Sequence, residues 1–404
     1  MRILRERGAT LSSQVFLVSP SDGPLFPCLE TLAWSDAPRE LVRIIPWIIS
    51  PRTTTVDLTF SDPEAAPTIA EFPALCPNLS KISFRCLPRN SIITAAVSRM
   101  LLSTNENTLR YLNVDSPLTE EACGVVCKFA GLRELSVVIE EGTSFPSVVL
   151  PNLTKLTVKF GYNGDWLQGF RGAALGKLTS VTFHSESEPT DDFLEAFESV
   201  ALATSTPETL STFRFHTSHP WRPSYRSLLP FTQLKELIID FSCERGCSSA
   251  IDVDTISPVA RAMPKLRVLH LGHPPCRESS TGVTAMGLVN LALDCPDLSE
   301  LCIHFRVASL ADMLGTSWTS NCASVLLDVG AMPVPDGLAE GVITVLPRVF
   351  PRLLHIDYTD RSWEVVMRAI LRSGYIADCS GRECLYAPRS NFSDISPRSY
   401  FRGW

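Results

Sequence analysis

The sequence lacks a long apolar run and an excess of basic residues. No stretch reaches the ~18 uninterrupted apolar residues that a membrane-spanning helix needs. The first residues carry charges with no apolar core behind them, so no signal peptide is expected. Lysine and arginine number 36 against 43 aspartate and glutamate, a net charge of −7. This balance argues against nucleic acid or an anionic membrane as the principal partner, and we expect a cytoplasmic or nuclear protein.

Motifs that build common active sites are also missing. The sequence contains no glycine-rich phosphate loop of the Walker type, no G-x-S-x-G and no H-E-x-x-H. We therefore expect no enzymatic activity, no catalytic residue and no cofactor.

Cysteine is present, but not in a pattern typical of disulfides or zinc. The count of 13 is odd, and we interpret the residues as reduced thiols of an intracellular core. The apolar contexts that favour this are those of Cys28, Cys76, Cys86 and Cys302. The pair Cys123 and Cys127 has helical spacing and is expected to pack in the core. Cys243 and Cys247, with His270, His273 and Cys276 downstream, leave zinc binding as an alternative. Structural zinc favours tighter, paired spacing, so we predict no metal.

A repeat dominates the sequence that remains. The motif L-x-x-L-x-apolar recurs in thirteen copies, of which two are weaker and open with threonine or serine. The copies begin at Leu29, Thr53, Leu79, Leu109, Leu132, Leu153, Leu178, Leu210, Leu234, Leu266, Leu298, Ser324 and Leu353. The first and last copies lie twelve intervals apart, so the mean repeat is about 27 residues, within the ~20–29 of leucine-rich repeats.

The repeat predicts an α/β leucine-rich-repeat solenoid, or horseshoe. Apolar positions four and six of each motif point to one side of a short strand, into the core. Right-handed crossovers then give a parallel β-sheet on the concave face and helices on the convex face. We expect a partial first repeat over residues 1–24, the solenoid over 25–372 with a terminal capping helix from Trp363 to Leu371, and a mobile tail over 373–404.

The segments between motifs carry helical signals. We expect helices over residues 38–49, 91–102, 119–129, 190–201 and 283–293, with Thr119 and Thr190 placing capping hydroxyls before acidic residues. Proline precedes many motifs by a few residues and is expected to end the helix and set up the turn into the next strand. The prolines concerned are Pro27, Pro73, Pro77, Pro151, Pro264, Pro296 and Pro351.

Four phrases in this order resemble the F-box and leucine-rich-repeat proteins of mushroom-forming fungi, over roughly residues 8–372. The phrases are Gly23–Pro27 before Leu29–Leu32, Cys76–Leu79, Asp115–Ala122 and Leu327–Gly330. In that family an F-box docks the adaptor of an SCF-type ubiquitin ligase, and the repeats present a substrate. No Leu-Pro-x-Glu-like F-box phrase precedes Leu29, so we expect the F-box to be truncated or lost.

The resemblance therefore implies a protein-recognition module like the substrate-binding region of an F-box receptor. The SCF adaptor is an expected partner only if an F-box lies upstream. Two alternatives stay open: a stand-alone leucine-rich-repeat scaffold or inhibitor of a partner enzyme, and a regulator of a small GTPase.

Histidine is unevenly placed along the motifs. Positions three, five and seven are expected to face the concave side, and five of the seven histidines fall there. We predict that another protein binds this face through a mixed-charge patch of His184, Arg214, His216, Asp240, His270, His304, Asp328 and His355. An acidic or hydrogen-bonding segment is the expected partner, with His184 and His216 as near neighbours and an affinity that depends on pH.

Two other interpretations of the patch stay open: exposed strand positions accept polar residues of any kind, or the histidines bind a metal. The N-terminal positions of the same face carry mostly small side chains: Thr31, Ala33, Ser35, Thr55, Asp57 and Thr59. We therefore expect binding to be concentrated in the C-terminal two-thirds.

Overall fold

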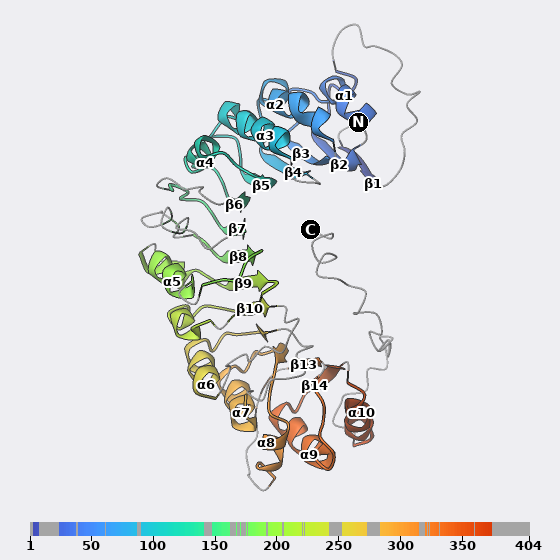
Figure 1. Cartoon of the computed structure of the whole chain (residues 1–404), viewed down its shortest axis with the longest axis vertical. Coiled ribbons are helices and arrows are strands. Elements are labelled where there is room, and N and C mark those ends of the chain that lie inside the picture. Colours follow the sequence, from blue (N-terminus) through green and yellow to red (C-terminus); the bar gives the residue numbers. More distant parts are fainter. Residues whose placement is uncertain are drawn as a thin grey trace. The chain divides into compact units, whose positions relative to one another are not determined.

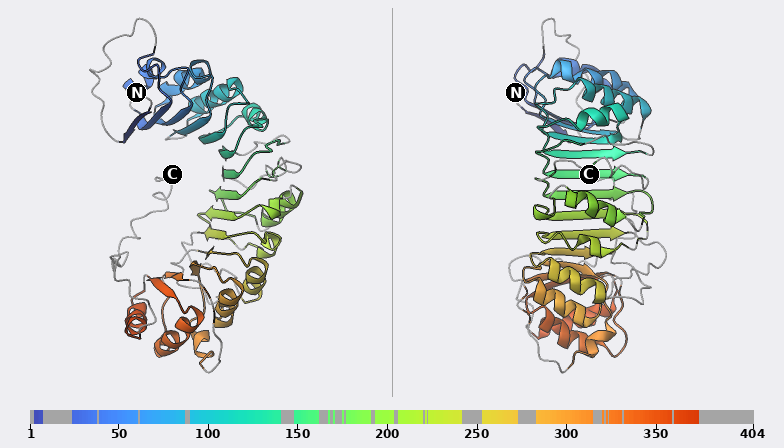
Figure 2. Two further views of the ribbon diagram at one scale, coloured as in Figure 1. Left: turned by 180° about the vertical axis from the view of Figure 1, so that it is seen from behind. Right: turned by 90° about the vertical axis from the view of Figure 1, so that its left-hand side faces the viewer.

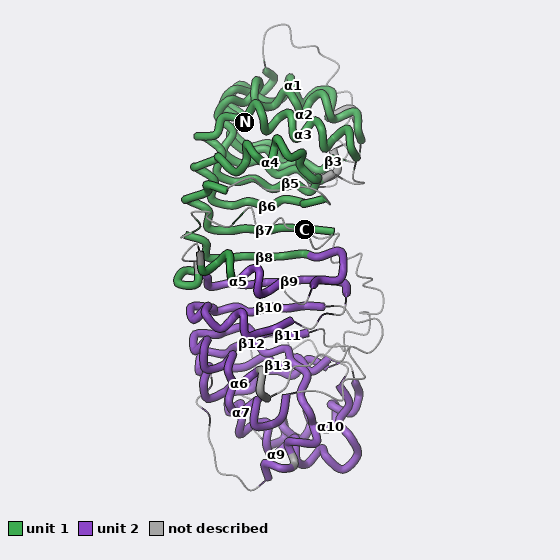
Figure 3. Tube along the Cα trace, turned by 60° about the vertical axis from the view of Figure 1, so that its left-hand side comes forward, with its two compact units in different colours: residues 1–184, 199–209 green, residues 185–198, 210–404 purple. Residues whose placement is uncertain are grey.

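A computed structural model of the chain shows strands and helices alternating in two compact units. Unit 1 comprises residues 1–184 and 199–209, and unit 2 comprises residues 185–198 and 210–404 (Figure 3). The residues that the structure describes are 3–7, 24–37, 39–60, 62–86, 90–140, 148–161, 167, 170, 175, 177–190, 193–203, 206–219, 221, 223–241, 253–272, 283–314, 320, 322, 324–330, 332–358 and 360–373.

Unit 1 holds the first eight strands and four helices between them. Its strands are β1 (Ile3–Arg7), β2 (Thr31–Ala37), β3 (Thr55–Phe60), β4 (Lys81–Cys86), β5 (Tyr111–Pro117), β6 (Glu134–Ile139), β7 (Lys155–Phe160) and most of β8 (Ser180–Ser185). Its helices are α1 (Arg39–Ile48), α2 (Ala66–Leu75), α3 (Ser91–Ser103) and α4 (Glu120–Val126), with 3₁₀ turns at Pro63–Ala65 and Thr206–Glu208. The strands follow chain order, and the pairs from β1 to β7 are parallel.

Unit 2 repeats the plan with six strands. These are β9 (Thr212–Thr217), β10 (Glu236–Phe241), β11 (Val268–Leu271), β12 (Glu300–Ile303), β13 (Val325–Gly330) and β14 (Leu353–Tyr358), again parallel and in chain order. The helices are α6 (Val253–Ala262), α7 (Ala285–Asp294), α8 (Ala308–Ala311), α9 (Ala339–Val349) and α10 (Ser362–Arg372), with a 3₁₀ turn at Tyr225–Leu228. Helix α5 (Phe193–Ala203) contributes residues to both units.

The repeat phase is confirmed by the burial of the motif residues. All thirteen motifs coincide with a strand, β2 to β14, and their residues at positions four and six are buried, with Tyr358 the half-buried exception. In β3, β7, β9 and β10 burial alternates along the strand as the side-chain period of two requires. The predicted α/β architecture of parallel strands and intervening helices is therefore confirmed.

Consecutive repeats are joined by one recurring backbone contact. The carbonyl at motif position two accepts hydrogen bonds from two successive N–H groups of the next repeat. In unit 1, Ser80 and Lys81 donate to the Thr54 oxygen at 2.8 and 3.0 Å. In unit 2, Lys235 and Glu236 donate to the Ser211 oxygen at 2.8 and 3.0 Å. Where position two is serine or threonine, its hydroxyl often donates to the same carbonyl, as in Ser80, Thr154 and Ser299.

The turns before the motifs confirm the predicted role of proline, with one correction. The N–H of Leu79 donates to the Cys76 carbonyl across Pro77, and Leu298 donates to Cys295 in the same way. Proline at the second residue of such a turn has the backbone angle that the turn needs. Pro73, however, lies inside α2 and does not end it, because two further helical residues follow before the turn.

The helices cover one side of the strands in each unit. Helices α1 to α4 lie on one face of the strands of unit 1, and α6 to α9 lie on one face of those of unit 2 (Figures 1 and 2). Most predicted helices are confirmed within a few residues, and Thr119 caps α4 by accepting from the Ala122 N–H at 3.3 Å. We call the opposite face, which carries motif positions three, five and seven, the open face.

The predicted capping helix is α10. Trp363 is fully buried, and its indole Nε1 donates to the Met332 carbonyl oxygen at 2.7 Å. Ser362 accepts from the Val334 N–H at 2.8 Å, so the first turn of α10 is held to the segment before α9. The predicted mobile tail lies outside the described residues from residue 374 onward.

Candidate functional site

The open face of unit 2 arranges its side chains in rows across the strands. The register of β9 to β14 places Thr212, Glu236, Val268, Glu300, Leu326 and His355 in the row of motif position three. The row of position five contains Arg214, Ile238, His270, Cys302, Asp328 and Asp357. Position seven pairs His216 with Asp240. Most of the predicted patch is thus brought onto one surface.

The histidines of this surface are paired with carboxylates and do not form a cluster. His216 Nδ1 lies 3.0 Å from Asp240 Oδ2 on the next strand. His270 Nε2 lies 2.9 Å from Glu300 Oε1, also on the next strand. Both imidazoles are more than half buried. Imidazole and carboxylate on neighbouring strands therefore form a local unit, repeated along the sheet.

Two further ion pairs extend the pattern to the ends of unit 2. Arg214 Nη2 lies 2.8 Å from Glu236 Oε2, and His355 Nε2 lies 3.2 Å from Asp357 Oδ1 within β14. The hydrogen bond that Asp357 accepts from His355 raises the pKa of His355, because it favours the protonated imidazole. Glu236, Glu300 and Asp357 complete these pairs, and motif positions three and five place them on the same face as the predicted patch.

His304 departs from the prediction of an exposed site residue. His304 is buried, with only 7% of its surface exposed. Backbone at Val283 runs alongside it: the Val283 N–H donates to the His304 carbonyl at 3.0 Å, and Arg306 donates to the Val283 carbonyl at 2.8 Å. β12 ends at Ile303, so His304 lies beyond the strand, where the backbone pairs with Val283 and the alternation of the strand no longer places the side chain on the open face.

The remaining predicted residues, His184 and Asp328, have separate environments. His184 is half-buried at the end of β8 in unit 1, whereas His216 belongs to unit 2, so their proximity stays a prediction. Asp328 Oδ1 accepts from the Gly330 N–H at 2.9 Å, where Gly330 has a φ of 54°. Asp328 thereby helps to form the turn that ends β13.

Thiols contribute little reactive chemistry among the described residues. Cys302 lies in the position-five row but is 5% exposed, and burial, followed by nearby acids, raises its pKa. Burial raises the pKa of Cys123 and of Cys127 to about 12, as core packing predicts for that pair. Cys28 is exposed, so its assignment to the core was wrong.

A metal site is not found in the part of the chain that the structure describes. No group of three or more histidine, cysteine, aspartate or glutamate side chains there could hold a metal ion. The second candidate zinc pair, Cys243 and Cys247, lies outside the described residues together with His273 and Cys276. His270, the one described member of that set, is paired with Glu300.

The open face of unit 1 differs in charge from that of unit 2. Its predicted small residues, including Thr55, Asp57 and Thr59, are half-buried as expected for this face. Further along, Lys155 pairs with Glu134 at 3.1 Å and Lys159 with Asp115 at 2.6 Å. Between β3 and β7 these rows hold four cationic side chains (Lys81, Arg85, Lys155 and Lys159) and three carboxylates (Asp57, Asp115 and Glu134). The rows of these five strands are close to neutral.

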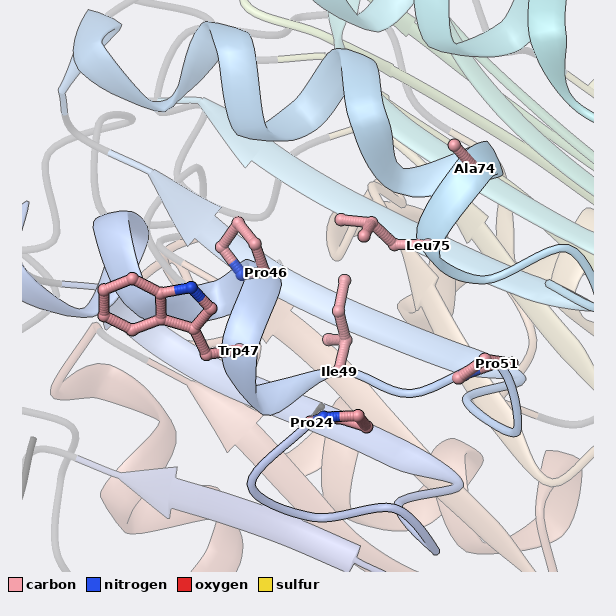
Figure 4. A pocket seen from close by; sticks show the side chains of 7 residues that line it. All are labelled: Pro24, Pro46, Trp47, Ile49, Pro51, Ala74 and Leu75. Carbon is pink, nitrogen blue, oxygen red and sulfur yellow. The ribbon is translucent and has the colours of Figure 1, made fainter. Parts of the chain in front are cut away.

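An apolar hollow of about 320 Å³ lies on the helix side of unit 1 (Figure 4). The ends of α1 and α2 form it, with Trp47 41% exposed at its edge. Its lining residues are Pro24, Pro46, Trp47, Ile49, Pro51, Ala74 and Leu75. None of these seven side chains is an acid or a base at physiological pH, so the hollow offers apolar contact and no proton transfer.

Comparison with known proteins finds no family model and no curated protein that matches this chain. None of the described helices is long and apolar enough to cross a membrane. The open faces are therefore the basis on which a function can be proposed.

Proposed function

We propose that this chain is a protein-recognition module of the leucine-rich-repeat horseshoe type. The observation that carries the proposal is the alternation of burial along the repeated strands. Side chains at positions four and six form the core, while most of those at positions three, five and seven stay accessible in rows that buried residues such as Ser83, Cys302 and His304 interrupt. Repeat proteins use such rows as extended binding surfaces.

The distribution of polar groups supports a macromolecular ligand. Charged, hydrogen-bonding and apolar side chains are spread over six neighbouring strands of unit 2, about 4.8 Å apart, and do not converge on one pocket. Small-molecule sites are usually concave and bury most of their ligand, unlike this arrangement. A protein segment can contact several rows at once.

We further propose that the recognition is that of a substrate receptor, as the resemblance to F-box and leucine-rich-repeat proteins implies. The repeats would present a substrate, and the SCF adaptor would bind only through an F-box upstream. Co-purification of the full-length gene product with the adaptor tests this role. Failure to co-purify would favour a stand-alone scaffold.

The recognition surface is tested by site-specific photo-crosslinking in cells of the source organism. A photoreactive amino acid replaces Leu326, which is 42% exposed on the open face, or Val365, which is 59% exposed on α10. Both sites are exposed apolar positions of unit 2, so they form a matched pair. We expect protein adducts from position 326 and few from position 365. Adducts from position 365 alone, or from neither, would contradict the proposal.

A further inference from the structure

The charge of the open face of unit 2 is unbalanced. Five carboxylates lie in its three rows against one permanently charged guanidinium, that of Arg214. The carboxylates are Glu236, Asp240, Glu300, Asp328 and Asp357. We call this surface the acidic face. It comprises the five carboxylates, Arg214, the apolar residues between them and three half-buried histidines, His216, His270 and His355. With neutral histidines it carries an excess of four negative charges, in contrast to the near-neutral rows of β3 to β7 in unit 1.

Apolar side chains separate the carboxylates in the row of position three. Val268 stands in register between Glu236 and Glu300, and Leu326 stands between Glu300 and His355. Leu326 is 42% exposed although its motif neighbours on both sides, Val325 and Leu327, are buried. When a partner covers an exposed leucine, the burial stabilises the complex by roughly 25 cal/mol per Å² of apolar surface removed from water.

The spacing of Glu236 and Glu300 excludes a compact ligand that binds both carboxylates at once. Glu236 and Glu300 lie two strands apart, which separates their backbones by roughly 10 Å. A single metal ion needs ligands that converge, and no such group exists among the described residues. A chain that carries several cations can reach carboxylates on successive strands and place apolar side chains between them.

We infer that the acidic face binds a basic protein segment in which lysine or arginine residues are interleaved with apolar residues. The inference rests on the proposed function and specifies the partner and the unit that holds it. Complementary charge steers such a segment to the face, and the apolar residues cover Val268 and Leu326. The charge excess favours this basic partner over the acidic one that the histidine pattern suggests by itself.

Selection from a phage-displayed library of random peptides on the immobilised full chain, at pH 7.5 and low salt, tests the inference. We expect the selected peptides to be enriched in lysine and arginine. Fluorescence polarisation of a selected peptide then compares the wild type with the double variant Glu236→Gln/Glu300→Gln. We expect the double variant to bind about tenfold more weakly, because two charge contacts are lost.

The matched control is Glu134→Gln. Glu134 also occupies motif position three, is half-buried and pairs with a cation, Lys155, but it lies in unit 1. We expect this variant to bind like the wild type. A shared thermal midpoint checks the fold of each variant. If the double variant does not fold, wild-type binding must still weaken when salt rises from 50 to 300 mM, because salt screens exposed charges.

Selected peptides with no basic excess, or equal binding by the double variant and the wild type, would overturn the inference. An equal loss with Glu134→Gln would overturn the assignment to unit 2. If photo-crosslinking at position 326 still gives protein adducts, the proposed function of protein recognition stands even when the basic partner or the assignment to unit 2 is overturned. Failure of both the selection and the crosslinking would overturn both.

Discussion

Replacing Trp363 by phenylalanine tests whether α10 closes the core of unit 2. The indole is fully buried, its Nε1 donates to the Met332 carbonyl at 2.7 Å, and its ring lies edge-on to Phe305 with centroids 6.3 Å apart. Phenylalanine keeps an aromatic ring but has no N–H group. Met332 is itself buried, so its carbonyl loses a partner where water has little access.

The expected destabilisation follows from two losses. An unpaired buried polar group costs about 1–3 kcal/mol. The smaller ring also leaves part of the indole volume empty, and complete truncation of a buried Trp to alanine costs about 3–5 kcal/mol. We therefore expect Trp363→Phe to lower the free energy of unfolding by about 2–4 kcal/mol. Trp363→Ala should lower it by at least as much.

A second aromatic residue of unit 2 provides the control. Tyr225 is buried at 5% exposure, its hydroxyl has no hydrogen-bond partner, and burial raises its pKa. Tyr225→Phe removes a buried polar group that bonds to nothing, so it should leave stability unchanged or raise it by up to about 1–2 kcal/mol. The two variants delete one polar group each, with opposite expected results.

Urea unfolding followed by circular dichroism measures both changes, with the shift in midpoint multiplied by the shared slope. Hydrogen exchange should also rise first in β13 and β14 of Trp363→Phe, because these strands lie nearest to α10 along the repeat. A loss below about 0.5 kcal/mol for Trp363→Phe would refute the role of the indole hydrogen bond. So would an equal loss for Tyr225→Phe.

Three further predictions concern the acidic face and the thiols. Affinity for a basic peptide should fall from pH 7.5 to pH 5.5, measured by fluorescence polarisation, because protonation of His355, whose pKa Asp357 raises, reduces the negative charge of the face. Asp357→Asn should lower the pKa of His355, measured by NMR titration, since it removes the carboxylate that raises it; an unchanged pKa would contradict the pairing. Iodoacetamide should alkylate exposed Cys28 in the native protein well before buried Cys295, whose pKa is raised to about 12, and unfolding should abolish the difference seen by peptide mass spectrometry.

The repeat could be predicted from the sequence because its signal is redundant. Thirteen copies in one phase specify which residues are buried, and an error at a weak copy such as Thr53 is corrected by its neighbours. Helices were harder to predict: α2, α6 and α9 were not predicted, and each contains an internal proline, which normally argues against a helix. Helix α1 was predicted although it contains Pro46. Packing against neighbouring repeats outweighs that local preference.

The candidate site could be predicted only in part. The alternation of the strand identifies which side chains share a face, so His216, His270 and Asp240 were found. It does not identify which residues pair, since pairing depends on register and rotamer. Nor could it anticipate that β12 would end at Ile303 and that the backbone after it would pair with Val283, because that contact joins segments about 20 residues apart outside the regular strands.

The pairs on the acidic face also explain how so many carboxylates share one sheet. Like charges on neighbouring strands are destabilising, and Asp328 stands in register with Asp357. Most of the carboxylates form a pair with an arginine or a histidine, and these two partners respond differently to pH. The guanidinium beside Glu236 keeps its charge at every physiological pH, whereas the imidazole of His355 loses its charge as pH rises through a pKa that Asp357 raises. Asp357 therefore becomes less compensated with rising pH, and its pair with His355 should carry a pH dependence of binding. Accordingly, Asp357→Asn should move the pH profile of peptide affinity to lower pH and Glu236→Gln should leave its midpoint unchanged; an equal shift with both would show that the His355 pair does not control it.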